Sequence, residues 1–439
     1  MFKYLNIFRG LLFSNTGVTQ TIAKNTFWLF FGQIASRLLR AAIVIYAARI
    51  LGAASWGAFS YALGIATFLT TFSDIGINAL ITKESSRNPQ LKDQYLSTAF
   101  FIKIGLVIIL VVGLIIYFPK LVKIEEAAAI MPILIFVFAF DTLRDLGSAI
   151  SRALEKMQIE AGVQIFTNLA IVVLGFILLK FSKTSEALSF AYAVGSGLGL
   201  VAIFYILRHH FRNLLKHFNW RLIKQIILTA WPFGLMGLMG VIMLNTDIIM
   251  LGWMRSSEEV GYYSAAQKVI QLLYVLPALI ATSIFPIMAR MAKLNAIFVK
   301  TMLEKTTAFV ILVSIPVTVI GILFAGPIIN LLFGSAYAQS ILTFQILMAT
   351  ILIIYPSTLI GNAIFAYDQQ KSFILYVLVA AFGNVGFNLL LIPRFGIEGA
   401  AISTILVQLI TNSLIWLKMK RINNLSILPQ IKKILKNQL

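Results

Sequence analysis

The feature that most constrains this sequence is a series of apolar blocks, each of the roughly 20 residues that a helix needs to cross a hydrocarbon layer. A backbone that crosses lipid must satisfy its own hydrogen bonds, so it forms either helices or a closed barrel. Barrel strands alternate apolar and polar residues, whereas the block at 104–118 reads IGLVIILVVGLIIYF. The sequence therefore predicts an all-α polytopic membrane protein.

Charge and cysteine content narrow the function. Only 12% of the residues are charged, against about 25% in soluble domains. The absence of cysteine excludes thiolate metal sites, disulfides and cysteine nucleophiles. The net charge of +20 would suit nucleic acid, but the basic residues gather in short connections between apolar blocks, as membrane orientation requires. We therefore expect a lipid bilayer and no nucleic acid as partner. The longest connection, 208–225, leaves no room for a soluble catalytic domain.

The apolar blocks predict about twelve membrane-spanning helices. Most of the loop lysine and arginine lies at the two chain ends and in the connections after the even-numbered helices, which places both termini in the cytoplasm and the chain in the plasma (inner) membrane. The predicted helices are 24–50, 57–81, 97–118, 127–151, 160–180, 187–207, 226–252, 260–288, 306–328, 340–366, 373–392 and 398–417.

A short internal repeat divides the chain in two. The connection LGAASWGAFSYA (51–62) and the connection LGWMRSSEEVGYYSAA (251–266) both read Leu-Gly, a turn, then Gly, two residues and Ser. Six helices separate them, so both halves enter the membrane in the same orientation. We predict two pseudo-symmetric six-helix lobes around a central cavity. The expected parts are an interfacial N-terminal segment (1–23), an N-lobe (24–207), a basic linker (208–225), a C-lobe (226–417) and a basic amphipathic tail (418–439).

Nine ionisable residues fall inside the predicted helices. Each costs about 2.5–3.5 kcal/mol at the bilayer centre, so each should face a partner or a wet cavity. Lys103 lies near a predicted helix end, from which we expect it to snorkel to the interface. The nine are Arg37, Arg40, Asp74, Lys103, Asp141, Arg144, Asp145, Asp247 and Lys268.

Several of these charges belong to polar stripes. Gln33, Ser36, Arg37 and Arg40 recur at the spacing that places them on one helix face. Two guanidinium groups on one face exceed what one carboxylate can balance, and such forks suit phosphate oxygens. A second stripe holds Asp141, Arg144, Asp145, Ser148 and Arg152, and a third holds Ser264, Gln267, Lys268 and Gln271. We take Arg37, Arg40, Gln33, Arg144 and Lys268 as candidate cavity residues that bind substrate.

The same charges could instead form a structural network. Arg144 could neutralise Asp141, Asp74 could pair with Arg37, and Asp247 with Lys268. We expect no metal or organic cofactor, but a proton or sodium gradient could drive the protein. The coupling candidates are Asp74, Asp141, Asp145 and Asp247, and the sequence leaves both roles open for each.

Several longer stretches resemble one family: ARILGAASWGAFSYA (48–62), FSDIGINALITKE (72–84), WPFGLMGLMGVIMLNTDIIMLG (231–252), GYYSAA (261–266), LLFGSAY (331–337) and LLIPRFGIEGAAISTIL (390–406). With them the chain resembles the Wzx-type polysaccharide flippases of the multidrug/oligosaccharidyl-lipid/polysaccharide exporter superfamily. The resemblance implies two MATE-like six-helix lobes, alternating access and no enzymatic activity. It also implies that a polyprenyl-diphosphate-linked oligosaccharide is moved to the outer leaflet, next to other polysaccharide-assembly membrane proteins.

The resemblance also bears on single residues. In related lipid-precursor flippases, arginines of the first helix face the cavity, and SRLLRAAIVIYAARILGA (36–53) resembles that helix. This supports Arg37, Arg40 and Arg49. The alternatives are a multidrug cation antiporter of the same superfamily, a membrane glycan polymerase or ligase, and a non-transporting assembly partner. Five of the nine intramembrane charges are positive, which disfavours a site for cationic drugs, and short outer connections disfavour an enzyme.

Overall fold

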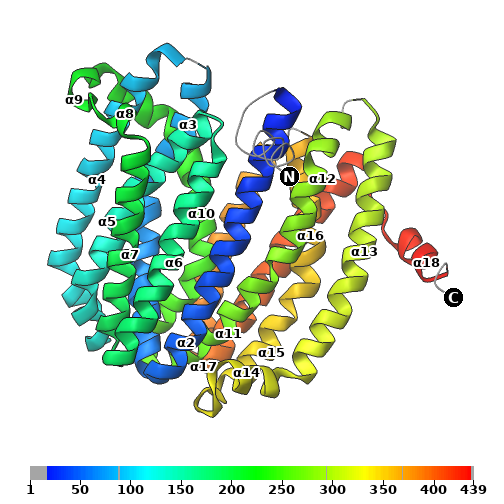
Figure 1. The fold of residues 1–439 in the computed structure, drawn as a ribbon. Helices are drawn as coiled ribbons and strands as arrows, with labels where there is room; N and C mark the ends of the chain where they lie inside the picture. The colour runs from blue at the N-terminus through cyan, green and yellow to red at the C-terminus, as the bar shows by residue number, and fades with distance from the viewer. Residues whose placement is uncertain (1–16, 88, 293, 368, 437–439) are drawn as a thin grey trace, which may run out of the picture. The chain divides into compact units, whose positions relative to one another are not determined.

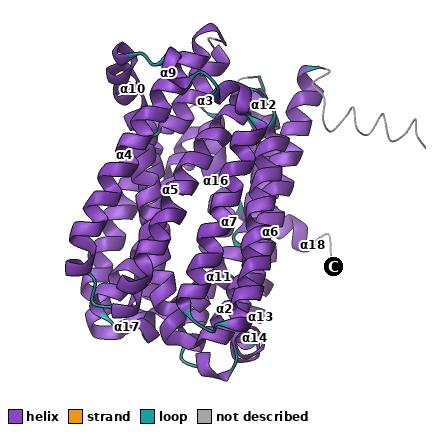
Figure 2. Ribbon diagram, turned by 60° about the vertical axis from the view of Figure 1, so that its left-hand side comes forward, coloured by secondary structure: helices purple, strands orange, loops and turns teal. Residues whose placement is uncertain are grey.

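The computed structural model describes residues 17–87, 89–292, 294–367 and 369–436. Within these ranges the chain forms helices and no strand (Figures 1 and 2), as the apolar blocks predict. Most of the predicted N-terminal interfacial segment lies outside the described residues.

The helices follow one another with short connections. Their bounds are α2 Val18–Asp74, α3 Ile77–Arg87, α4 Lys92–Leu121, α5 Glu125–Ala153, α6 Met157–Phe181, α7 Ser185–Ile206, α8 Arg208–Phe211, α9 Leu214–His217, α10 Trp220–Met254, α11 Ser257–Leu273, α12 Val275–Met291, α13 Ala296–Leu323, α14 Ala325–Phe333, α15 Ser340–Met348, α16 Thr350–Ala366, α17 Gln370–Asn423 and α18 Leu428–Lys436, with 3-10 turns at Pro89–Leu91 and Ser335–Tyr337.

Nine helical stretches of the described residues are long and apolar enough to cross a membrane. Two of them, Ala23–Asp74 and Leu375–Asn423, span 52 and 49 residues. About 20 residues suffice for one crossing. The chain is therefore a multi-pass membrane protein.

Each of the two longest helices contains one glycine that leaves helical geometry. Gly52 in α2 has φ 74° and ψ 174°, and Gly396 in α17 has φ 57° and ψ −131°. Glycine adopts positive φ without a steric penalty. The breaks fall where the sequence predicts connections, at 51–56 and 393–397, and this part of the prediction is confirmed.

Other helix boundaries were predicted wrongly. The predicted helix 57–81 ends at Asp74, because Ile75 and Gly76 take left-handed conformations, and α3 then runs through a predicted loop to Arg87. The predicted helix 260–288 divides at Tyr274 into α11 and α12. Pro277 has no N–H to offer the carbonyl of Leu273, and the Tyr355 hydroxyl donates to that carbonyl instead, at 2.9 Å.

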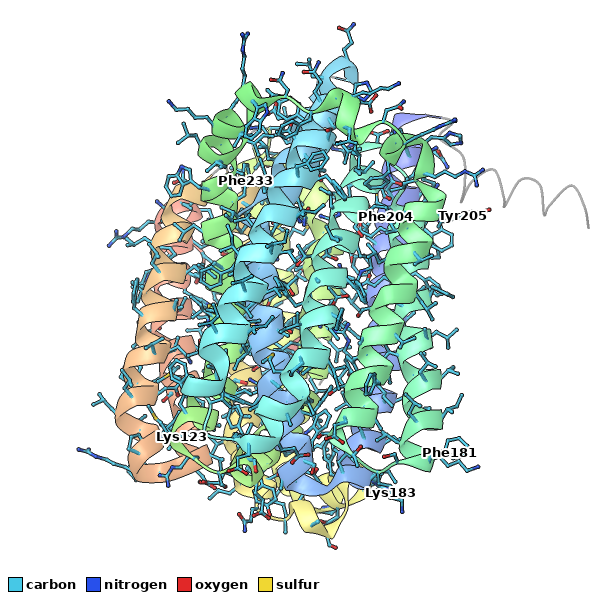
Figure 3. The ribbon with its side chains drawn as sticks, turned by 90° about the vertical axis from the view of Figure 1, so that its left-hand side faces the viewer. Lys123, Phe181, Lys183, Phe204, Tyr205 and Phe233 are labelled. Atoms are coloured by element: carbon cyan, nitrogen blue, oxygen red, sulfur yellow. The ribbon has the colours of Figure 1, made fainter. Side chains whose placement is uncertain are left out.

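The chain forms two compact units. Unit 1 comprises residues up to Leu51 and Tyr61–Val241, and unit 2 comprises Gly52–Ser60 and Ile242–Leu439, so α2 and α10 contribute to both. Figure 3 shows the connections that carry Lys123 and Lys183 at one end of unit 1, with Phe204 and Tyr205 of α7 toward the other end. The core of unit 1 includes Ile77, Leu80, Leu96, Ala99, Leu146, Ile150 and Ile203, contributed by α3, α4, α5 and α7.

The two repeated motifs pack against each other within unit 2. A Cβ added at Gly57 would overlap the carbonyl oxygen of Ser257, and one added at Gly261 would overlap that of Ala53. Ser257 lies four residues before Gly261, and Ala53 lies four residues before Gly57, so the two contacts are reciprocal. The Ser264 hydroxyl donates to the Ser60 hydroxyl at 2.9 Å. Equivalent positions of the repeat thus occupy equivalent places in one close helix crossing, which we call the glycine crossing.

Candidate functional site

The first polar stripe lies on the N-terminal half of α2, in unit 1. Its side chains Gln33, Arg37 and Arg40 are exposed, whereas Ser36 is buried. These residues lie inside a helical stretch that crosses the membrane. A guanidinium exposed to hydrocarbon is costly, so these groups require water or a polar ligand beside them.

The two arginines of this stripe have no acidic partner among the described residues. Arg40 donates through Nε and Nη2 to the Asn168 side-chain oxygen of α6, at 3.3 and 3.2 Å. The Arg37 side chain makes no hydrogen bond or ion pair with any residue that the structure describes, and it experiences the positive charge of Arg40. The stripe therefore presents uncompensated positive charge at membrane depth, with guanidinium donors free to bind an anion.

Asp74, for which the sequence left open a pairing with Arg37, pairs instead with Lys103. The Lys103 ammonium lies 2.8 Å from the Asp74 carboxylate and also donates to Asn78 Oδ1 at 2.8 Å and to the Thr142 carbonyl at 3.4 Å. Its side chain is completely buried, so the expected snorkelling of Lys103 is wrong. Asp74 also accepts the backbone N–H of Asn78 at 3.2 Å. The pair thus fixes the junction between α2 and α3, a structural role.

The arginines of α5 have carboxylate partners within unit 1. Arg144 lies 2.7 Å from the Asp141 carboxylate and 3.3 Å from that of Asp145, which confirms the predicted pairing with Asp141. Arg152 makes two hydrogen bonds to the Glu160 carboxylate, at 2.8 and 2.9 Å. Arg144 is therefore a weaker candidate for binding substrate than Arg37, because two carboxylates already hold it.

The most enclosed acid of unit 2 is Asp247, on α10, with 1% of its surface exposed. Its carboxylate accepts hydrogen bonds from side chains on α11 and on both arms of α17: Tyr263 at 2.5 Å, Asn384 at 3.0 Å, Asn388 at 2.7 Å and Thr404 at 2.8 Å. All four donors are neutral. The predicted pairing of Asp247 with Lys268, a half-buried residue of α11, stays a prediction.

The surroundings of Asp247 are rich in oxygen. Asn388 Oδ1 is buried and, within the described part of the chain, has no hydrogen-bond partner. Together with the Asp247 carboxylate, Asn384 Oδ1 and Thr404 Oγ1, it supplies the oxygen ligands that hard cations prefer. Asn384 and Asn388 stand four residues apart on one face of α17, a spacing that the sequence shows; Tyr263 and Thr404 carried no such signal.

The described parts of both units thus define a multi-pass α-helical membrane protein with uncompensated arginines and an enclosed carboxylate at membrane depth. Residues 22–292 match the model of a family described as "Polysaccharide biosynthesis protein". The chain belongs to this family.

Similar proteins agree with this assignment. The chain is 23% identical over 401 residues to a "Putative O-antigen transporter" of Shigella flexneri, covering 87% of this chain and 94% of the relative. It is 22% identical over 391 residues to a "Probable low-salt glycan biosynthesis flippase Agl15" of Haloferax volcanii, covering 88% and 80%.

Solved structures share the fold. The chain is similar to "Lipid II flippase MurJ, inward closed conformation", with a TM-score of 0.71, 16% identity and coverage of 90% of this chain and 87% of the other. It is also similar to a multidrug resistance MATE family transporter in an inward-facing conformation, with a TM-score of 0.75, 13% identity and coverage of 91% and 99%. The predicted all-α fold, similar to that of MATE transporters, is confirmed, whereas the twelve crossings and the two six-helix lobes stay predictions.

Proposed function

We propose that the protein is a flippase that moves a polyprenyl-diphosphate-linked oligosaccharide across the plasma membrane for cell-surface polysaccharide synthesis. The observation that carries this proposal is the exposed guanidinium of Arg37 beside that of Arg40, without an acidic partner in the described part of the chain. A diphosphate is the anion whose oxygens match two such forks. The family, and relatives named as an O-antigen transporter and a glycan flippase, support this substrate class.

The proposed topology has twelve crossings in two six-helix lobes, with both termini in the cytoplasm. The broken helices α2 and α17 are each long enough for two crossings. Counting two crossings for each of these helices and one for each of the other seven apolar stretches gives eleven crossings. Helix α10, with 35 residues, supplies the twelfth. The symmetric contact between repeated motifs supports lobes related by a parallel repeat.

In the proposed mechanism, Arg37 and Arg40 hold the diphosphate while the lipid tail stays in the bilayer. Gln33, one helical turn before Arg37, offers an amide to the sugar next to the diphosphate. Alternating access then moves the headgroup to the outer leaflet. Relatives named as transporters, together with the short connections between helices, favour a transporter over an enzyme that makes or breaks glycan bonds.

We assign coupling to Asp247 rather than to Asp74, Asp141 or Asp145. Each of those three carboxylates already lies within 3.3 Å of the cation of Lys103 or Arg144. Asp247 has four neutral donors, and Asn388 adds a buried unpartnered oxygen. In this proposal, a proton or a sodium ion binds at Asp247, Asn384, Asn388 and Thr404.

The proposal is tested by export of a surface glycan in a strain that lacks its own flippase. Arg37→Glu reverses a charge at the proposed diphosphate site, so we expect export to fall to the level of the empty vector. Arg221→Glu makes the same change at an exposed arginine near the start of α10 and should export as the wild type does. Wild-type export by Arg37→Glu, at equal protein level, would refute the role of the stripe.

A further inference from the structure

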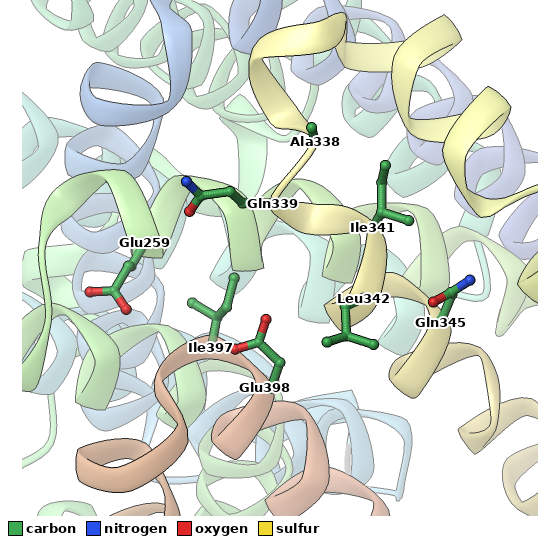
Figure 4. Close-up of a pocket in the computed structure, with 8 residues that line it drawn as sticks. All are labelled: Glu259, Ala338, Gln339, Ile341, Leu342, Gln345, Ile397 and Glu398. Atoms are coloured by element: carbon green, nitrogen blue, oxygen red, sulfur yellow. The ribbon is translucent and has the colours of Figure 1, made fainter.

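A pocket of about 410 Å³ lies in unit 2 (Figure 4), and its lining residues include neither Asp247 nor a residue of the α2 stripe. Three chain segments line it: the start of α11 with Glu259, the start of α15 with Gln339 and Gln345, and the start of the second arm of α17 with Glu398. In Figure 4, Glu259 and Gln339 lie on one side, Gln345 on the opposite side, and Glu398 between them. All three segments adjoin connections that we predict to be on the outer side of the membrane.

Two of the lining segments are held in place at α11: one is the first turn of α11 itself, and the other, with Gln339, is fastened to it. Ser256 and Glu259 form a reciprocal pair of hydrogen bonds that begins α11, at 3.2 and 3.3 Å. Tyr337, just before Gln339, is completely buried and meets the Tyr262 ring edge-on at 6.0 Å. The Ser340 hydroxyl donates to the Tyr262 carbonyl at 2.9 Å. These contacts hold Glu259 and Gln339 in place.

The third segment is fastened by Arg255. Its guanidinium donates to the carbonyls of Ile392 and Pro393, at 2.7 and 2.8 Å. Gly396 then turns the chain with a positive φ, close beside the Glu259 carboxylate: a Cβ there would lie 3.0 Å from its oxygen. The pocket is therefore preformed, which lowers the entropic cost of binding a ligand.

The free polar groups of the pocket are mainly acceptors. The side chains of Glu398 and Gln339 make no hydrogen bond or ion pair with any residue that the structure describes. Gln345 uses its amide N–H on the Ile322 carbonyl at 3.1 Å, which leaves its oxygen available. Two carboxylates and no basic residue line the pocket, although the whole chain carries a net charge of +20.

The apolar part of the lining comes from Ile341, Leu342 and Ile397. Acceptors beside an apolar patch match a pyranose ring, whose hydroxyls donate hydrogen bonds and whose C–H face packs on aliphatic side chains. The two negative charges exclude phosphate. The chemistry thus differs from that of the α2 stripe, which suits the anionic part of the same kind of substrate.

We propose that this pocket binds a sugar residue of the glycan, as a carbohydrate subsite distinct from the diphosphate site. The assignment rests on the proposed function for its biological meaning, but it makes its own claim about binding. It implies that the chain recognises the two chemical parts of its substrate at separate places. The pocket would then influence which glycan is accepted, while the α2 stripe would serve any diphosphate-linked carrier.

The direct test is binding of free sugars to the purified full chain, measured by saturation-transfer NMR. The probes are glucose, galactose, rhamnose and N-acetylglucosamine. We expect at least one to bind the wild type and to bind Glu398→Gln at least about tenfold more weakly, because a hydrogen bond to a charged acceptor is lost. Glu186→Gln, at an exposed glutamate in the first turn of α7, is the matched control and should bind as the wild type does.

Two results would overturn the subsite: no probe binds the wild type, or Glu398→Gln and Glu186→Gln bind equally well. Binding of calcium to the wild type, with no binding of any of the four sugars, would also overturn the subsite in favour of a cation site. Leu342→Trp fills the pocket from an exposed position, and it should reduce sugar binding without loss of folded protein. Because these measurements use free sugars, they stand whether or not Arg37→Glu abolishes export, so failure of the subsite and failure of the flippase proposal are separable.

Discussion

The intramembrane charges of unit 1 and unit 2 are stabilised in different ways. In unit 1 the carboxylates Asp74, Asp141 and Asp145 face Lys103 or Arg144. In unit 2, Asp247 is held by four neutral donors. An ion pair resists removal of either partner, since the other is left buried and uncompensated. A carboxylate among neutral donors can gain a cation without breaking a pair, which is why we propose Asp247, rather than the acids of unit 1, as the coupling acid.

The largest effect should follow from breaking the Asp74–Lys103 pair. Lys103→Met leaves Asp74 without its cation, and we expect a loss of about 3–5 kcal/mol of stability, as when one partner of a buried pair is removed. Thermal unfolding of the detergent-solubilised protein measures it. Asp74→Asn combined with Lys103→Met should recover much of the loss. Lys83→Met is the control, because Lys83 is 41% exposed and its nearest carboxylate lies 3.9 Å away. Equal stability of Lys103→Met and Lys83→Met would show that the pair holds nothing together.

A more selective effect should follow from neutralising Asp247. Asp247→Asn keeps the shape of the side chain but removes the charge that would attract a cation. We expect the protein to fold and to bind substrate, while its transport rate in proteoliposomes no longer responds to an imposed proton or sodium gradient. Comparison of rates with and without each gradient measures this. If the transport rate of Asp247→Asn still responded to the gradient and that of Asp145→Asn did not, coupling would lie in unit 1 rather than in unit 2.

The smallest effect is expected at Asp145. This side chain is 41% exposed and lies 3.3 Å from Arg144, which keeps its closer contact with Asp141. Asp145→Asn should therefore lower stability much less than Lys103→Met does, because Arg144 keeps its closer carboxylate partner. The shift in unfolding temperature measures it. A loss as large as that of Lys103→Met would mean that the α5 charges act as one network rather than as one strong and one weak contact.

Much of the fold could be predicted because lipid imposes a simple rule on the backbone. The apolar blocks predicted the all-α membrane fold class. The predicted connections at 51–56 and 393–397 contain Gly52 and Gly396, where helices α2 and α17 are interrupted. Helix ends were harder to predict, because the sequence changes gradually from apolar to polar residues where a helix leaves the lipid. Lys103 shows the consequence: α4 begins at Lys92 rather than at 97, so Lys103 lies about 16 Å along the helix rather than near its end, and its ammonium is buried against Asp74.

The candidate site was predictable only in part. Spacing along one helix identified the Arg37 stripe and the contact of Arg144 with Asp141, since both are local. Contacts between distant helices left no trace in the sequence: Asp74 meets Lys103 through the packing of α4, and Asp247 meets Tyr263 and Thr404 through that of α11 and α17. Asn384 and Asn388 were visible as a pair, but their partner was not.

The hydroxyl contact in the glycine crossing offers an experimental handle. Ser60 and Ser264 bring their side-chain oxygens to 2.9 Å in a chain that contains no cysteine. Replacing both serines with cysteine would create a single thiol pair in an otherwise thiol-free background, ready to be oxidised and then reduced. Such a reversible covalent clasp would show whether these two segments must part during each turnover.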